Sequence, residues 1–448
     1  MSRFAPRFLS LALVVAIAFA TATPTLASSP LPATTPQATG MVDLPGAGAS
    51  SVSVAVRTIV QAGTNVWIGG LFNQIDDANG NKVASASDLG VFDASTGLLV
   101  PGVHLPLVTS SKGRAEVYDS SLGPDGDLYF AGRFDAVDGQ ARSGAAAIDP
   151  ATGALLPFAP NPGTAHAILA ATGAIYVGTS KLLSFQPDGT PTPGYTPPQV
   201  STDLNLRTEM TEPQVRDIAQ RGNTLVAACQ CDSLTDASGT RAVKAVVEIN
   251  ATTGNWRDWT PGGLSMQSPA SGLGVFVRKL PATGQPTIYL AAGGNDFTAA
   301  FDFATGARVW REDTSGSSQA LTWYRGYLIV GGHFDWTQQP GGPQCGTNAH
   351  PDTECYFSPR LVAMDASTGA VLLGSGGRPW NPGICCQYDG VWTLRTGDDG
   401  STLNVGGEFI RAGGTWTCED AEASCLSGAR AQDYYARFTA PVAASRRS

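Results

Sequence analysis

The most informative pattern along the chain is a short apolar segment that recurs with two small residues near its end. The first copy reads Val66-Trp67-Ile68-Gly69-Gly70-Leu71-Phe72. Further copies begin at Leu128, Ile175, Leu225, Ile288, Leu328 and Leu403, and those at 128, 328 and 403 keep the small-small-x-Phe ending. Apolar runs of this length, rich in branched and aromatic residues and bounded by turn residues, are typical of buried β-strands. We therefore expect one such strand in each of seven repeats.

Each copy is flanked by further strand-like segments. An apolar run and a tight turn, such as Gly63-Thr64-Asn65, precede it and predict a β-hairpin. A second alternating run follows and ends in Asp-x-x-Thr-Gly, at 93–97, 149–153, 302–306 and 365–369, with Asn at 250–254. A short edge segment with an aromatic residue and proline comes next, as in Trp380-Asn381-Pro382. The repeat is therefore four antiparallel strands, here called A to D.

The Asp and Gly of the Asp-x-x-Thr-Gly phrase have a local explanation. Asp or Asn accepts hydrogen bonds from its own backbone two residues on, and Gly supplies the positive φ that closes a hairpin. The alternative is that these aspartates bind calcium. Five turns at equivalent hairpin tips explain the residues without a ligand.

The spacing of the repeats predicts the fold class. Copies start 40 to 75 residues apart, and the shortest interval matches a bare propeller blade of roughly 40 to 50 residues. The 53 glycines and 30 prolines suit a turn-rich all-β chain, and radial closure protects the edges of the sheets. We predict an all-β, seven-bladed β-propeller of four-stranded antiparallel blades over residues 41–442. The small pair should lie where neighbouring blades converge, with Trp67, Tyr129, Tyr176 and Tyr289 filling the space between blades.

The two ends of the repeat region predict how the ring closes. The last repeat has no obvious D strand after residues 434–440, and residues 39–49 precede the first A strand without a blade of their own. We expect residues 39–49 to supply the missing strand of the last blade.

The N-terminus has the pattern of an export signal. Arg3 and Arg7 precede an apolar run at 8–20, and Thr25-Leu26-Ala27 resembles a cleavage site. A membrane anchor is the alternative, but the run is shorter than the ~20 residues a span needs. We assign 1–27 to a signal peptide and, from composition, 28–40 to a disordered leader and 443–448 to a disordered tail. The protein should be secreted and extracellular, with no membrane span in its mature form.

The charge of the chain restricts its partners. The formal net charge is -9, and removal of Arg3 and Arg7 with the signal changes it to -11. An acidic chain without a cluster of Lys and Arg is poorly suited to phosphate backbones. We therefore expect no nucleic-acid partner.

Eight cysteines lie in the second half of the chain: Cys229, Cys231, Cys345, Cys355, Cys385, Cys386, Cys418 and Cys425. An even number in an oxidising compartment predicts disulfides, and the spacings are not those of zinc sites. Bridges from Cys345 to Cys355 and from Cys418 to Cys425 would each close a polar loop. The other four residues can pair with their sequence neighbours or with the loop cysteines, and the sequence leaves both possibilities open.

The combination of Gly-Gly-x-Phe, an apolar strand and Asp-x-x-Thr-Gly resembles the delta-60-repeat propellers of secreted bacterial proteins. It is also similar to the kelch-type propellers of fungal cortical polarity markers. The resemblance extends from Val56 to Ala440, although the third, fourth and fifth copies depart from Gly-Gly-x-Phe. It implies a propeller fold and transfers no catalytic residue.

The longest insertions indicate where a site would lie. Residues 334–360 and 409–434 are B–C loops of the last two repeats, 379–390 is the D–A loop between them, and together they hold six of the eight cysteines. B–C and D–A loops meet at one end of a propeller, and braced loops on a rigid scaffold are common binding sites. The alternative is that they cover an apolar edge. The candidate binding residues are His333, Asp335, Trp336, Tyr356, Trp380 and Trp416.

Catalytic motifs are not found in the sequence. We see no H-E-x-x-H, no G-x-S-x-G and no phosphate-binding loop. His333 and nearby carboxylates could in principle form a metal or acid–base site, but solvated loop residues explain them, and we assign no metal, cofactor or catalytic residue. The leading hypothesis is a monomeric, non-catalytic module that binds an extracellular protein or glycan. A secreted hydrolase or lyase is the alternative, which two histidines or three carboxylates in the central channel would favour. A rigid surface-display protein is a third possibility.

Overall fold

A computed structural model of the chain describes residues 31–45, 54–202, 213–264, 270–280, 283–339, 345, 355–374, 377–386, 390–419 and 423–440. The predicted signal peptide and C-terminal tail lie outside these residues. The described chain is built from β-strands and includes one short 3-10 turn, η1 (Ala423–Cys425). Within these ranges no helix has the length and apolar character needed to cross a bilayer.

The core of the fold consists of antiparallel sheets that repeat the predicted A, B and C strands. The A strands are β2 (Ala55–Ala62), β8 (Glu116–Leu122), β13 (Ala167–Ala171), β17 (Gln214–Arg221), β22 (Ser271–Lys279), β26 (Ser318–Tyr324) and β31 (Gly390–Thr396). The B strands are β3 (Asn65–Leu71), β9 (Leu128–Arg133), β14 (Ala174–Gly178), β18 (Thr224–Gln230), β23 (Pro286–Gly293), β27 (Tyr327–Gly332) and β32 (Thr402–Glu408). The C strands are β6 (Leu89–Asp93), β12 (Ala145–Ile148), β15 (Leu182–Phe185), β21 (Val246–Asn250), β24 (Phe297–Asp302), β30 (Leu361–Asp365) and β37 (Tyr435–Thr439).

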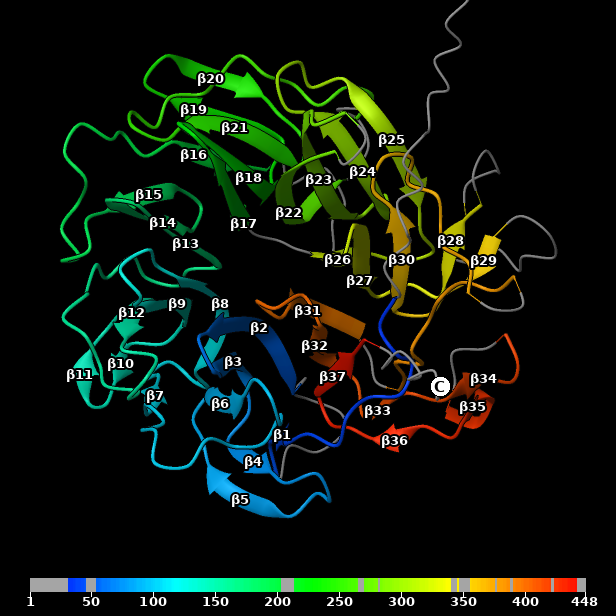
Figure 1. Cartoon of the computed structure of the whole chain (residues 1–448). Coiled ribbons are helices and arrows are strands. Elements are labelled where there is room, and N and C mark those ends of the chain that lie inside the picture. The colour runs from blue at the N-terminus through cyan, green and yellow to red at the C-terminus, as the bar shows by residue number, and fades with distance from the viewer. Residues whose placement is uncertain are drawn as a thin grey trace, which may run out of the picture.

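The sheets are arranged around a common centre, as in a β-propeller (Figure 1). Each A strand packs against the A strand of the next sheet, in the order β2, β8, β13, β17, β22, β26 and β31. Strand β31 also packs against β2, so the first and last sheets are neighbours. The A strands therefore surround the centre, and the B and C strands lie progressively outward.

The two glycines of the recurring phrase are required by contacts on two sides. A Cβ on Gly69 would lie 2.6 Å from Cγ1 of Val117, on the A strand of the next sheet. A Cβ on Gly70 would lie 1.9 Å from the carbonyl oxygen of Ala55, on the A strand of its own sheet. Gly406 in the last sheet faces Val56 of the first in the same way, at 2.6 Å. The prediction that the small pair lies where sheets converge is confirmed.

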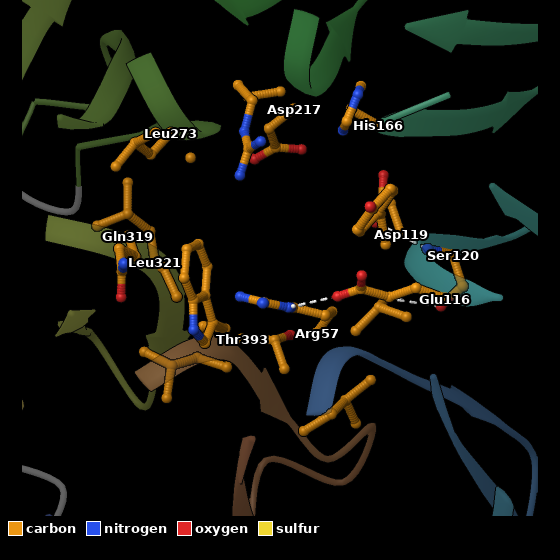
Figure 2. A pocket seen from close by; sticks show the side chains of 18 residues that line it. Arg57, Glu116, Asp119, Ser120, His166, Asp217, Leu273, Gln319, Leu321 and Thr393 are labelled. Carbon is orange, nitrogen blue, oxygen red and sulfur yellow. Dashed lines mark hydrogen bonds and ion pairs between the residues drawn. The ribbon is translucent and has the colours of Figure 1, made fainter. Parts of the chain in front are cut away.

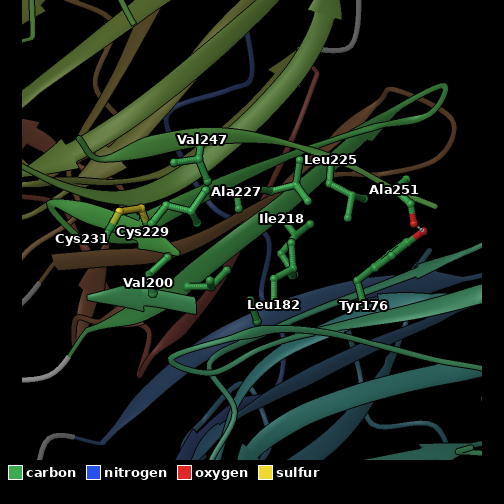
Figure 3. Close-up of a cluster of buried hydrophobic side chains, with 14 of the residues drawn as sticks. Tyr176, Leu182, Val200, Ile218, Leu225, Ala227, Cys229, Cys231, Val247 and Ala251 are labelled. Atoms are coloured by element: carbon green, nitrogen blue, oxygen red, sulfur yellow. Dashed lines mark hydrogen bonds between the residues drawn. A yellow bond between two sulfur atoms is a disulfide. The ribbon is translucent and has the colours of Figure 1, made fainter. Parts of the chain in front are cut away.

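The aromatic residues of the B strands fill the space between sheets, as expected. Trp67, Tyr129, Tyr176 and Tyr289 are all buried. The Trp67 indole donates to the Pro150 carbonyl. The Tyr176 hydroxyl donates to the Ala251 carbonyl, which Figure 3 shows. Both acceptors follow directly after the first residue of an Asp/Asn-x-x-Thr-Gly turn of the next sheet. Trp67 and Tyr176 therefore connect their B strands to the C–D turn of the next sheet, whereas the Tyr129 hydroxyl donates to Asp125 of its own sheet.

The predicted D strand is complete in one described sheet, where β25 (Arg308–Asp313) pairs with β24. Elsewhere it is reduced to single bridges after the C–D turn, at Leu99, Leu155, Pro191, Trp256 and Val371. The physical reason lies in the edge segments, which several times carry proline. Proline has no N–H to extend a ladder.

The N-terminal segment takes the D-strand position of the last sheet. The Ala33 and Gln37 amides donate to the Thr439 and Arg437 carbonyls of β37, both at 2.8 Å. Strand β1 (Met41–Asp43) then pairs with β4 (Gln74–Asp76) beside the first sheet. The expected link between the first and last sheets is present, but it is made by residues 33–43 rather than 39–49. The assignment of 28–40 to a disordered leader is therefore wrong from residue 31 onward.

A second tier of short strands lies at the end of the sheets where the A strands begin. It is formed by B–C hairpins and by the segments that precede A strands: β5 (Lys82–Ser85), β7 (Val108–Thr109), β10 (Ala136–Val137), β11 (Gln140–Ala141), β16 (Gln199–Ser201), β19 (Ser233–Asp236), β20 (Gly239–Ala242), β28 (Trp336–Gln338), β29 (Cys355–Phe357), β33 (Arg411–Ala412), β34 (Thr415–Trp416), β35 (Leu426–Ser427) and β36 (Arg430–Ala431). Strand β7 pairs with β10, and β16 with β19. The D–A and B–C connections thus meet at one end, as the sequence analysis assumed.

Candidate functional site

The three long insertions of the last two sheets meet around one cavity of about 480 Å³, here called the loop pocket. Cys355, Tyr356 and Phe357 of β29 line it from the first insertion, and 377–381 line it from the D–A connection. Thr415 and Trp416 of β34 complete the wall with Thr34 of the N-terminal segment. Segments that are far apart in sequence therefore form one concave surface.

Aromatic side chains form the inner wall of the loop pocket. The Phe357 ring lies 4.9 Å from the Trp336 ring and 5.5 Å from the Trp416 ring, between centroids. Tyr356 and Phe357 are half-buried, whereas Trp380 and Trp416 are buried. A ligand in this cavity would meet ring faces and edges together with a few polar groups, which is the usual composition of a small-molecule site.

Asn381 holds the parts of this wall together. Its side-chain Nδ2 donates to the carbonyls of Pro359 and Leu361, both at 2.8 Å. Its Oδ1 accepts from the Trp416 indole at 3.1 Å and from the Gly383 amide at 2.8 Å. A single amide thus fixes the first insertion, the D–A connection and the aromatic wall in one geometry.

The structure brings together some of the predicted binding residues. Tyr356, Trp380 and Trp416 line the loop pocket, and Trp336 lies behind its wall against Phe357. Asp335 does not line it and instead pairs with Arg360 at 2.5 Å. His333 is exposed and does not line it either. Four further residues line or position the wall and are not among the predicted ones: Phe357, Arg378, Asn381 and Glu419. Of these, Asn381 belongs to the recurring aromatic-x-Pro edge phrase at Trp380-Asn381-Pro382.

Four pairs of cysteines lie at disulfide distance. Two close the loops predicted from sequence, Cys345 with Cys355 and Cys418 with Cys425. The remaining cysteines pair with their sequence neighbours, Cys229 with Cys231 and Cys385 with Cys386. Cys385 and Cys425 belong to a small apolar cluster with Trp416. Three of the four pairs therefore brace the segments around the loop pocket.

A second cavity, of about 400 Å³, lies at the centre of the ring and is here called the channel pocket. In six of the A strands a β-bulge inserts one extra residue, and each of these residues lines the cavity: Arg57, Tyr118, Arg216, Leu273, Gln319 and Trp392. His166, directly before β13, contributes from the remaining sheet. Figure 2 shows Arg57, His166, Leu273 and Gln319 around this common space. Bulges frequently redirect side chains toward functional sites.

Three carboxyl groups face the channel pocket, and each has structural partners. Asp119 accepts from the Ile168 amide of the next sheet at 2.8 Å, and Asp217 accepts from the Val275 amide of its next sheet at 2.7 Å. Glu116 pairs with Arg57 at 3.1 Å and with Arg133 at 3.2 Å. Burial raises the pKa of Asp217 to about 6 and raises the pKa of Asp119 well above its usual value. These groups connect neighbouring A strands.

The single histidine of this cavity is not positioned as a base. The His166 ring stacks on Tyr118 with centroids 4.9 Å apart, and burial, followed by the charge of Arg216, lowers the pKa of His166 to about 4. In the part of the chain that the structure describes, no group of three or more His, Cys, Asp and Glu residues is arranged to hold a metal ion. The turn aspartates instead cap their own backbone, as Asp93 does with the Ser95 and Thr96 amides.

Comparisons with known proteins identify no relative by sequence. No protein-family model matches the chain, and no curated protein matches it. Among solved structures, the chain is similar to the computationally designed Ika8 protein, with 12% identity, a TM-score of 0.46, and coverage of 90% of this chain and 99% of that one. It is also similar to the WD40 β-propeller domain of Doa1, with 9% identity, a TM-score of 0.47, and coverage of 91% and 97%. Membership of the delta-60-repeat or kelch-type families stays a prediction.

Proposed function

We propose that the chain is a secreted, seven-bladed β-propeller that binds an extracellular glycan through the loop pocket. The observation that carries the proposal is the aromatic wall of Tyr356, Phe357 and Trp416, set in a concave cavity. Aromatic faces pack against the apolar faces of sugar rings, and the carbonyls, amides and charged groups at the rim can bind hydroxyls. A concave cavity of this size suits one end of a glycan better than the flat surface of a protein.

The proposal also accounts for the bracing of the site. Three cysteine pairs, Asn381 and the N-terminal segment hold the walls, and the Trp380 indole donates to the Pro32 carbonyl at 2.9 Å. A preorganised site loses little conformational entropy when it binds a ligand. Such construction is expected of a binding site and is more than a loop needs to cover an apolar edge.

A glycan array probed with residues 28–448 tests the proposal, followed by calorimetry with a glycan that binds. Tyr356→Ala should lower the affinity at least about tenfold, which corresponds to ~1.4 kcal/mol, because its half-buried side chain lines the cavity. Tyr327→Ala is the matched control, since this residue is also half-buried but does not line the loop pocket. Absence of binding across the array, or wild-type affinity in Tyr356→Ala, would refute the proposal. Selective capture of a protein would point to a different ligand class.

The hydrolase alternative has one observation in its favour, the three carboxyl groups at the channel pocket. Each of them is already used in contacts between or within the sheets. Incubation of a bound glycan with the protein, followed by mass analysis of the products, separates the two functions. Cleavage that Asp217→Asn abolishes would favour the hydrolase.

A further inference from the structure

Arg216 differs from the other charged residues of the channel pocket. It is the bulge residue of β17 and lines the cavity. No hydrogen bond or ion pair joins its guanidinium to any of the described residues. Burial, and then the charge of Arg57, lower its pKa to about 10, which still leaves it positively charged at neutral pH. The cavity thus contains a cation with no directly paired carboxylate, and Glu116 acts on it only from a distance.

Arg57 lines the same cavity from β2, three sheets away from β17 in the order of A strands, and its charge is fully paired. It pairs with Glu116 at 3.1 Å and with Glu408 at 3.5 Å. Its guanidinium also lies 4.0 Å from the centroid of the Trp392 ring. The two carboxylates of that network are thus engaged with Arg57, and Arg133 shares Glu116. Arg216 is half-buried, and a charge that is partly removed from water without a paired group is costly to a fold and is generally retained where a ligand pairs with it.

The other residues that line the channel pocket restrict which class of anion could bind to Arg216. A guanidinium matches the planar carboxylate with two parallel hydrogen bonds. A phosphate monoester would bring roughly two negative charges into a cavity that already holds Glu116 and Asp217. The Tyr118 hydroxyl and Ser120 offer polar contacts, and Leu273 and Trp392 offer apolar surface. The surroundings therefore favour a small monoanion with hydroxyl groups and an apolar face.

We propose that the channel pocket is a second binding site, which takes a carboxylated monosaccharide of the uronic acid class with Arg216 as the counter-ion of its carboxylate. A cavity of about 400 Å³ has room for one such sugar. The site is separate from the loop pocket, because the two share no lining residue. This proposal therefore does not depend on the proposed glycan site in the loop pocket.

The first test uses the unaltered protein, residues 28–448, and two probes of nearly the same shape. Calorimetry should detect binding of D-glucuronate, and its methyl ester, which lacks the negative charge, should bind at least tenfold more weakly. Acetate, which offers the carboxylate alone, should compete with glucuronate. Equal binding of the acid and the ester, or no binding of glucuronate at millimolar concentration, would overturn the proposal.

The second test changes the protein. Arg216→Met should lower the affinity for glucuronate at least tenfold, and Arg216→Lys, which keeps the charge but not the planar fork, should lower it less. Arg221→Met is the matched control, because Arg221 lies on the same strand β17 but does not line the channel pocket. Thermal unfolding establishes that each variant is folded. Wild-type affinity in Arg216→Met would contradict the assignment, as would an equal loss in the Arg221 variant.

Discussion

The loop pocket and the channel pocket lie at the same end of the sheets but are held in different ways. The loop pocket is made of inserted segments, and its walls depend on cysteine pairs, on Asn381 and on the N-terminal segment. The channel pocket has no inserted segment among its lining residues, which come from the A strands and the residue before β13. Hydrogen bonds from one A strand to the next, such as Asp119 to Ile168, hold its wall.

This difference indicates that the two cavities can vary independently. Changes in the insertions would alter the loop pocket and leave the ring of A strands intact. Changes at the bulge positions would alter the channel pocket with no effect on the braced loops. One scaffold could therefore carry two recognition sites, and the following experiments examine how separate they are.

Removal of residues 31–40 should have the largest effect. It takes away the acceptor of the Trp380 indole and one of the acceptors of the Gln432 amide and of the Arg437 guanidinium, together with the two edge hydrogen bonds to β37. A buried group left unpaired costs roughly 1–3 kcal/mol and each other lost hydrogen bond about 1 kcal/mol, so the free energy of unfolding should fall by about 5 kcal/mol. Chemical denaturation measures the loss. Because β31 still packs on β2, glucuronate binding in the channel should survive below the melting temperature, whereas glycan binding should be lost.

A shortened chain that begins at residue 31 is the control for this deletion, and it should unfold as the full mature chain does. Equal stability of the chain that lacks 31–40 would show that the N-terminal segment does not close the ring. Loss of both binding activities in the folded deletion variant would show that the two cavities are not independent.

The second effect is a dependence of stability on pH that comes from buried acids near the channel. Burial raises the pKa of Asp88, which lies near Glu116, to about 8. Its folded pKa exceeds its unfolded value, so the folded state holds the proton more tightly and stability falls as pH rises from about 4 to 8. Each pH unit is worth ~1.4 kcal/mol, so Asp88 alone should lower the free energy of unfolding by roughly 3–4 kcal/mol between pH 5 and pH 8, as measured by urea unfolding.

Asp88→Asn should reduce the decrease by about this amount and raise stability at pH 8, because the amide is neutral and can still accept the hydrogen bond from the Phe72 amide. The part of the slope that comes from other buried acids, such as Asp217 and Glu248, should remain. Asn also tolerates the left-handed backbone at this position, where φ is 64°. Asp93→Asn is the control, since hydrogen bonds lower the pKa of Asp93 to about 2 and its titration ends below pH 5. An unchanged slope in Asp88→Asn would mean that other acids dominate.

The sequence predicts the fold better than it predicts the sites. The glycine pair and the Asp-x-x-Thr-Gly turn recur because every sheet meets the same neighbours, so the repeat is visible along the chain. Tyr356, Trp380 and Trp416 could be proposed because loops with Trp and Cys stand out by composition. The N-terminal segment was misjudged from its prolines, but Ala33 and Gln37 lie between them and donate the edge hydrogen bonds.

No recurring sequence pattern marks the residues that line the channel pocket. The lining includes a bulge residue from six sheets and His166 from the seventh, and these residues differ in type: Arg, Tyr, His, Arg, Leu, Gln and Trp. Six of them lie at bulges, where the alternation of the strand is interrupted, so the two-residue period does not indicate which way they point. The unpaired state of Arg216 depends on distances between sheets, which no local pattern contains.

Reduction of the cysteine pairs should weaken ligand binding at the loop pocket more than at the channel pocket, and the effect should be smaller than those above. Three of the pairs brace the insertions around the loop pocket, and the fourth, Cys229 with Cys231, ends β18 away from it. A flexible site binds more weakly because ordering it costs entropy. With a reducing agent present, glycan affinity should fall about tenfold and glucuronate affinity should change less than twofold in calorimetry. Similar losses at both sites would show that the disulfides support the whole ring.

The smallest expected effect concerns a hydrogen bond that joins the first two A strands beside the channel. The Thr58 hydroxyl lies 2.7 Å from the Ser120 hydroxyl, where a neutral pair takes the role that Asp119 plays between β8 and β13. Ser120→Ala removes a neutral bond and should cost about 1 kcal/mol, whereas Asp119→Ala leaves the Ile168 amide unpaired and should cost roughly 2–3 kcal/mol. Urea unfolding of both variants measures the difference.

A double-mutant cycle of Ser120→Ala with Thr58→Val isolates the energy of the hydroxyl pair. A coupling energy near zero would show that packing alone holds β2 against β8. Because loop-pocket residues take no part in these bonds, glycan affinity should stay unchanged in every one of these variants.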